Sequence, residues 1–244
     1  LNAIKVELGR KKATLENINA IEAGEDQNLN MGKMIMTQII NSGEFQTTNM
    51  DSIITLVNDE LNEGVKHFKN QIDYSYNLKF DPRKDIVKDN YDDYTEKFYG
   101  NNDVEGPEAS HGTHVAGIIG ADRTNKIGIQ GVADQAILMS VRAVPDGDER
   151  DKDIANAIIY AVNNGAKVIN MSFGKGYSPG KKYVDQAVKY AAKKDVLLVH
   201  AAGNSSADND ATPNFPNRRY AKKGIFGKKS ADNWIEVGAL NWQT

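Results

Sequence analysis

One histidine in this sequence has the neighbours that acid–base chemistry requires. His111 lies in the run Ser110 to Gly117 (SHGTHVAG) and is followed by apolar residues up to Gly120. Imidazole titrates near neutral pH, so His111 can take up and return a proton during a reaction. The small and apolar residues after it predict a buried helix that starts at the site and packs close to a sheet. A polar residue at the entrance of an ordinary helix is the plainer interpretation of the same run.

An asparagine follows a strand pattern elsewhere in the chain. Asn204 comes just after residues 196–202, a near-continuous apolar run that is typical of a strand covered on both faces. An asparagine amide donates two hydrogen bonds without carrying charge. Aimed at a developing oxyanion, one such donor supplies about 3–4 kcal/mol of transition-state stabilisation. A turn asparagine fits the same position equally well.

A third candidate is the segment Ser172 to Gly174, which follows a strand pattern at 167–171. Exposed backbone N–H and C=O groups in such a segment can pair with a peptide as an added strand. An ordinary strand-to-helix loop is the competing interpretation. If both strands are parallel, Ser172 and Asn204 lie on the same side of the sheet.

The elements that must position these residues alternate from His111 onward. The patterns predict strands and helices in turn, with Asp151 as an N-cap: strands at 136–144, 167–171, 196–202 and 234–240, and helices at 152–164 and 181–194. Alternating units of this kind predict an α/β fold, with a parallel sheet and helices on both faces. Such folds place their sites at the carboxyl ends of the strands.

The residues before His111 have a different pattern. Apolar periodicity predicts helices at 1–24, 31–40 and 51–72, the last with a stripe at Ile54, Val57, Leu61, Val65, Phe68 and Ile72. Residues 73–110 lose this periodicity and are rich in Tyr, Asn, Asp, Gly and Pro, which predicts a long loop. The oxygen-rich stretch 89–94 suits either a calcium ion or a plain solvated loop.

Composition narrows the class of protein. The chain has 244 residues and a net charge of −3, so nothing favours nucleic acid or an anionic membrane surface. It has no cysteine, which excludes disulfides, a thiolate nucleophile and cysteine metal sites. No apolar run has the length of a membrane-spanning segment. Because the chain starts at Leu1 without a signal peptide, we expect it to be a fragment of a longer protein.

Three motifs in this order resemble the subtilisin family of serine proteases: HGTHVAG at 111–117, VINMSFG at 168–174 and AAGN at 201–204. IGIQGVA at 127–133 also resembles the family's segment between its histidine helix and the next strand. The resemblance covers residues from about 108 to the end. It implies a partial, incomplete subtilisin-like catalytic domain at 108–244, with the helical and loop residues 1–107 as an insertion packed on it.

The resemblance also implies roles by position. His111 matches the general base and Asn204 the side-chain donor of the oxyanion hole. Ser172, Phe173 and Gly174 match the segment that pairs with the substrate backbone, and Phe173 shapes a substrate pocket. The implied activity is that of a secreted or cell-envelope serine endopeptidase, which hydrolyses polypeptides through an Asp-His-Ser triad. An intramolecular pro-segment is typical of the family and is not visible in this chain.

Two family motifs do not occur in the sequence: the Asp-Ser-Gly or Asp-Thr-Gly turn, and the Gly-Thr-Ser-Met-Ala run. Without the serine no acyl-enzyme forms, and without the aspartate the imidazole loses the group that fixes its tautomer. We therefore expect this polypeptide alone to be inactive and the parent protein to be active. The alternative is a non-catalytic peptide-binding relative, a pseudoprotease. Retention of both His111 and Asn204 favours the enzyme.

No cofactor is required for this chemistry, and calcium is an option. Arg123, Asn125, Ile127 and Ile129 lie where many family members bind a calcium ion, mostly through backbone carbonyls. The upstream ligands of that site are not found, so we name no metal-ligating residue. His200 matches no catalytic position and is expected to be a strand residue near the site.

Overall fold

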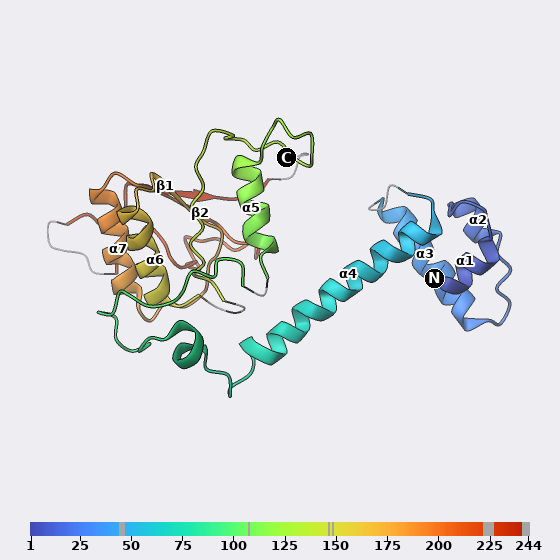
Figure 1. Cartoon of the computed structure of the whole chain (residues 1–244), viewed down its shortest axis with the longest axis horizontal. Coiled ribbons are helices and arrows are strands. Elements are labelled where there is room, and N and C mark those ends of the chain that lie inside the picture. The colour runs from blue at the N-terminus through green and yellow to red at the C-terminus, as the bar shows by residue number, and fades with distance from the viewer. Residues whose placement is uncertain (44–46, 107, 146, 148, 222–226, 241–244) are drawn as a thin grey trace. The chain divides into compact units, whose positions relative to one another are not determined.

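The computed structural model describes residues 1–43, 47–106, 108–145, 147, 149–221 and 227–240 (Figure 1). The chain divides into two compact units, Leu1–Asp73 and Tyr74–Thr244, each with a hydrophobic core. Residues 74–107 therefore belong to the second unit. Among the residues described, no helix is both long and apolar enough to cross a lipid bilayer.

Short helices build the first unit: α1 (Asn2–Leu8), α2 (Leu15–Asn19), α3 (Gln27–Ser42) and the longer α4 (Met50–Asn70). The prediction of one helix over 1–24 is wrong. Gly9 ends α1 with a φ of 60°, a left-handed conformation that glycine adopts without strain. Thr14 then caps α2, because its hydroxyl accepts a hydrogen bond from the backbone N–H of Asn17 at 3.3 Å.

The apolar stripe predicted for α4 is partly buried near the start of the helix, where Ile54 and Val57 pack against the core of the first unit. The buried residues of this helix, Met50 and Ile53, lie outside the predicted stripe. By contrast, Leu61, Val65 and Phe68 are more than 60% exposed. The periodicity therefore predicts the helix correctly but does not predict the burial of its stripe. It shows which residues share a face and not whether a partner covers that face. A π-helical turn, η1 (Gln71–Ser75), follows α4.

The second unit is an α/β structure, as predicted. Its described strands form one parallel sheet in the order β1 (Val168–Met171), β2 (Leu197–Ala201) and β3 (Trp234–Val237). The helices are α5 (Ser110–Gly120), α6 (Asp151–Asn163) and α7 (Lys181–Lys193). Figure 1 shows the strands between α5 and the pair formed by α6 and α7.

The core of this unit lies between the sheet and the α6–α7 pair. Ile154 and Ile158 of α6 and Val188 of α7 are at most 2% exposed. They pack with Met171 of β1 and Leu198 of β2 in one cluster. The predicted boundaries of α6, α7, β1 and β2 agree with the structure to within two residues, because each of these elements contributes apolar residues to this cluster.

Two predictions about the histidine region are wrong. No residue of α5 is buried, and Ile118 on this helix is 45% exposed. Residues 136–144 do not form a strand, and Ile137 is fully exposed. A strand needs a neighbour that pairs with its backbone groups, and none of the described strands lies in register with 136–144.

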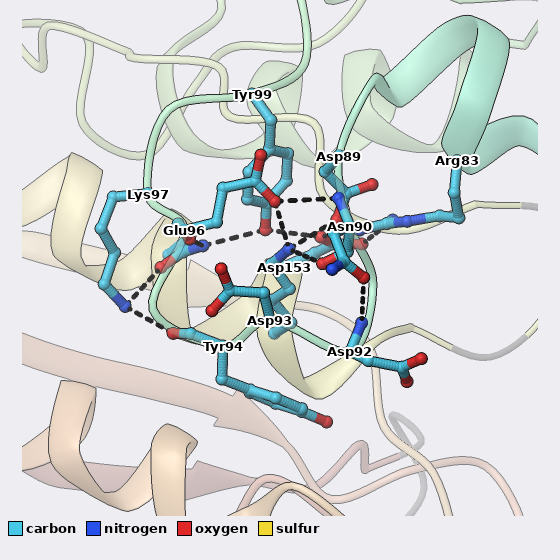
Figure 2. A network of polar contacts seen from close by, with 12 residues as sticks. Arg83, Asp89, Asn90, Asp92, Asp93, Tyr94, Glu96, Lys97, Tyr99 and Asp153 are labelled. Atoms are coloured by element: carbon cyan, nitrogen blue, oxygen red, sulfur yellow. Dashed lines mark hydrogen bonds and ion pairs between the residues drawn. The ribbon is translucent and has the colours of Figure 1, made fainter.

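Buried ion pairs attach the loop residues 83–99, which include the π-helical turn η2 (Arg83–Val87), to α6 (Figure 2). Arg83 donates to Asp89 Oδ2 at 2.5 Å and to Asp153 Oδ2 at 2.7 Å. Lys152 Nζ donates to Asp89 Oδ2 at 2.7 Å and to Glu96 Oε2 at 3.0 Å. The side chains of Lys152 and Asp89 are 1% and 0% exposed. The carboxylate of Asp89 thus serves two cations inside the protein.

These contacts shift the ionisation of the network. Burial alone would raise the pKa of Asp89, but hydrogen bonds from Arg83 and Lys152 outweigh it and hold the pKa below the ordinary value. Burial would lower the pKa of Lys152, and its bonds to Asp89 and Glu96 raise it instead. Asp89 and Lys152 therefore stay charged near neutral pH, and the loop remains attached to α6 there.

Candidate functional site

The carboxyl ends of β1 and β2 form one edge of the sheet. The two strands are parallel neighbours, and Met171 is in register with His200. Ser172 directly follows β1, and Asn204 lies three residues after the end of β2. Ser172 and Asn204 therefore leave the sheet at the same edge, which is where α/β folds place their sites.

The backbone of the segment Ser172 to Gly174 is free to pair. Within the described part of the chain, these three residues make no backbone hydrogen bond. The hydroxyl of Ser172 accepts a hydrogen bond from Asn170 Nδ2 at 2.8 Å. The ring of Phe173 packs against the core and is half-buried. The segment therefore combines a side chain fixed by packing with backbone groups that a peptide strand can use.

Asn214 connects the two strand ends, although sequence reasoning did not single it out. Its Nδ2 donates to the backbone oxygen of Ala201 at 3.2 Å. Its side chain also lies against two glycines. A Cβ on Gly174 would come within 2.4 Å of Asn214 Oδ1, and one on Gly203 within 3.7 Å of Nδ2. No local signal marks Asn214, because it stands in a polar loop among similar residues.

The connection from the segment to α7 is fixed by Asp151. Its carboxylate accepts hydrogen bonds from Ser178 Oγ at 2.8 Å and from the N–H of Gly180 at 2.7 Å, and it pairs with Lys175 Nζ at 3.0 Å. The prediction that Asp151 is the N-cap of the helix is wrong, since Arg150 has that place and Asp151 begins α6. Its side chain turns to the neighbouring loop, which leads back to Gly174.

His111 lies in the first turn of α5 and is exposed. In the residues that the structure describes, no hydrogen bond links its ring to Asn204 or to Ser172. The structure thus brings Asn204 and the segment 172–174 to one sheet edge, while His111 comes from a separate helix. That the imidazole and the amide act on one substrate atom stays a prediction.

A polar cluster around a buried histidine lies behind this sheet edge. His200 of β2 has a fully buried side chain, and its Nδ1 lies 3.1 Å from Glu236 Oε1 of β3. The His200 ring contacts Phe173 edge to face, with ring centroids 6.3 Å apart, and Trp234 at 5.3 Å. Trp234 Nε1 donates to Glu236 Oε2 at 2.8 Å. The sequence prediction of a strand residue near the site fits His200, but the pairing with Glu236 was not foreseen.

Two of the four residues considered for calcium, Arg123 and Asn125, use their side chains in local hydrogen bonds. Arg123 donates from Nε to the backbone oxygen of Gly131, and from Nη2 to that of Val132, both at 2.7 Å. Asn125 Oδ1 accepts a hydrogen bond from the N–H of Ile127 at 2.9 Å. In the described ranges, no group of three or more His, Asp or Glu side chains is placed to hold a metal ion.

The second unit combines a parallel α/β sheet, glycines and an asparagine at its carboxyl edge, and a histidine at the start of a helix. These features define the class of protein. The chain matches the subtilase family over residues 49–243. That match covers most of the sequence, so the chain belongs to the subtilase family. The resemblance seen in the three motifs is thereby confirmed.

Individual relatives match over shorter stretches. The thermophilic serine proteinase of Bacillus sp. (strain AK1) is 38% identical over 133 residues, which are 54% of this chain and 29% of that protein. Thermitase of Thermoactinomyces vulgaris is 41% identical over 107 residues, 43% of this chain and 37% of that protein. The solved structure "S41 Psychrophilic Protease" has 33% identity and a TM-score of 0.42, covering 53% of this chain and 39% of the other. The chain spans less than half the length of these relatives.

Proposed function

We propose that the protein is a serine endopeptidase that hydrolyses peptide bonds, and that this chain supplies part of its catalytic machinery. Family membership supports the reaction class. The observation that carries the proposal is the shared sheet edge: the unpaired segment 172–174 and Asn204 follow parallel, adjacent strands. A substrate paired with the segment would present its carbonyl near the asparagine amide.

In this proposal each residue has one role. His111 takes the proton from the nucleophile and returns it to the leaving amine. Asn204 donates a hydrogen bond to the oxyanion as it forms. Ser172, Phe173 and Gly174 hold the substrate backbone, with Phe173 at a side-chain pocket. The triad serine and aspartate belong to motifs that these 244 residues do not contain, so we expect the chain by itself to be inactive.

Other properties of the protein are proposed by family resemblance. The substrate is a polypeptide, and the protein acts in the secreted or cell-envelope compartment. Chemistry of this kind needs no cofactor, and any calcium would have a stabilising role through oxygen ligands.

The proposal is tested by replacing His111 and Asn204 in the full-length protein, with casein as substrate. We expect His111→Ala to lower kcat by at least about a thousandfold. We expect Asn204→Ala to lower kcat about 10²–10³-fold with little change in KM. His114→Ala, on the same helix, is the matched control and keeps most of the activity. Unchanged hydrolysis by the His111 variant would refute the proposal.

A second candidate is a non-catalytic protein that binds peptides on the segment 172–174. Its supporting observation is the same free backbone. A fluorophosphonate label, which reacts with an activated serine, distinguishes the two candidate functions. Labelling of the full-length protein supports the enzyme; peptide binding without labelling or hydrolysis supports the binder. Labelling or inhibitor-sensitive cleavage by the 244-residue chain itself would contradict its expected inactivity.

A further inference from the structure

Burying the imidazole of His200 at this position costs free energy of folding. Its side chain is fully buried on β2, between Phe173 and Trp234. Burying a polar ring costs free energy unless its nitrogens are hydrogen-bonded. In the described part of the chain Nε2 has no partner, although it is buried. An aliphatic residue here would pack without this cost, so the imidazole calls for a reason beyond packing.

The other ring nitrogen explains what the imidazole does. An ionised carboxylate only accepts hydrogen bonds, so Nδ1 of His200 is the donor to Glu236 Oε1. Glu236 in turn accepts from Trp234 Nε1, so both of its oxygens are used. The bond at Nδ1 and the ring contacts with Phe173 and Trp234 together hold the imidazole in one orientation. Phe173, whose edge-to-face contact depends on that orientation, is fixed with it.

The same carboxylate reaches the loop of the asparagine. Asn209 Nδ2 donates to the backbone oxygen of Ala202 at 3.0 Å and lies 3.4 Å from Glu236 Oε1. Ala202 comes two residues before Asn204. Glu236 therefore contacts the supports of two segments: Phe173 through His200, and the Asn204 loop through Asn209.

We propose that His200 and Glu236 form a positioning pair, which holds the segment 172–174 and the loop of Asn204 at a fixed separation from behind the sheet edge. Neither residue is assigned a contact with the reacting atoms. The catalytic part of this inference rests on the proposed function; the structural part does not. An oxyanion donor acts only when it is held in place, because a misplacement of 1 Å can cost about 10²-fold in rate.

Two backbone amides report on the pair in the 244-residue chain. The N–H of Ala202 is bonded to Val237 O at 2.8 Å, and that of Lys175 to Phe215 O at 2.9 Å. Glu236→Gln keeps the side-chain size but leaves one acceptor oxygen for the three N–H groups of His200, Trp234 and Asn209. We expect hydrogen exchange of both amides to become about tenfold faster, the loss of one hydrogen bond to a charged group. The amide of Val196, bonded to Ala191 O, should keep its rate.

Leu198→Ala is the matched control, because the apolar side chain of Leu198 is buried on the same strand. It should speed exchange throughout the second unit and not selectively at Ala202 and Lys175. In the full-length protein, His200→Ala and Glu236→Gln should lower kcat about 10- to 100-fold well below their melting temperatures. The Leu198 variant should lower the melting temperature and keep kcat.

A second substitution distinguishes the effect of an unpaired hydrogen-bond donor from the effect of losing the negative charge of Glu236. If Glu236→Gln acts by leaving one donor unpaired, its effect on exchange and kcat should shrink when Trp234→Phe removes the competing N–H, as measured by a double-mutant cycle. Unchanged exchange at Ala202 and Lys175 in both the His200 and Glu236 variants would overturn the inference. If exchange changes but the full-length protein shows no inhibitor-sensitive hydrolysis, the proposed function fails and the positioning pair stands.

Discussion

The helices α5 and α6 belong to the same unit and were predicted from similar apolar patterns, yet only α6 is buried. Ile154 and Ile158 of α6 are 2% exposed, while α5 has no buried residue. α6 packs on α7 and the sheet, and the loop 83–99 holds its first turn through Asp89 and Lys152. In the described residues, α5 receives backbone hydrogen bonds from the loop at Val132 and Ala133 but contributes to neither core cluster. The difference teaches that an apolar stripe identifies a helix, while burial depends on which partners reach it.

The largest expected effect tests the attachment of α6. Asp89→Ala leaves Arg83 and Lys152 without their shared carboxylate, and breaking a buried pair costs about 3–5 kcal/mol of unfolding free energy. Urea unfolding of the second unit measures this. Asp92→Ala, an exposed neighbour, should stay within about 0.5 kcal/mol. Equal effects of the two variants would show that the ion pairs do not distinguish α6 from α5.

Truncating a core residue that packs against α6 should lower the free energy of unfolding nearly as much as Asp89→Ala does. Leu198→Ala removes a side chain with no exposed surface from β2. Large-to-small changes of this kind cost about 2–5 kcal/mol, because a cavity remains. The midpoint and slope of chemical unfolding report the loss. A cost below about 1 kcal/mol would mean that this core is looser than its burial indicates.

Acid should weaken the attachment of the loop 83–99 to α6. The pKa of Asp89 lies below 3.8 in the folded state, so its contribution is complete above the unfolded value and is lost as the pH falls through the folded one. We expect wild-type stability to fall more steeply than that of Asp89→Asn as the pH falls below about 4. Parallel curves for the two proteins would remove Asp89 as the cause of the acid sensitivity.

The smallest expected effect lies on α5. Ile118 is 45% exposed, so Ile118→Ala should change the unfolding free energy by less than about 0.5 kcal/mol. Circular dichroism during urea unfolding, beside the Leu198 variant, checks this. A loss of 2 kcal/mol or more, within the range of about 2–5 kcal/mol for buried sites, would mean that α5 is packed, and the contrast with α6 would disappear.

The local sequence pattern predicted the helices and strands that pack around a single core. α7, β1 and β2 were found because apolar spacing and strand propensity agree there with the packing, and their parallel order follows from the βαβ rule. Subtilase motifs then placed Asn204 and the segment 172–174 at one edge. These predictions needed only neighbours in sequence.

The remaining features depend on residues far apart in the chain. Lys152 and Asp89 are 63 residues apart, and His200 and Glu236 are 36 apart. Nothing in the local sequence selects one Asp or Glu as a partner over the others. The error at 136–144 has the same origin, since a β-prone run becomes a strand only beside another strand. The position of the candidate site at this sheet edge was therefore predictable, and the residues that support the edge were not.

Asn214 and Gly174 are expected to constrain each other through evolution. A methyl group at position 174 would collide with the Asn214 amide, which is tied to Ala201. A library randomised at 174 alone should return glycine almost exclusively, whereas randomising both positions should recover pairs in which a larger residue at 174 accompanies a smaller one at 214. The close packing at this strand end thus couples the residue choices at two positions that lie forty residues apart.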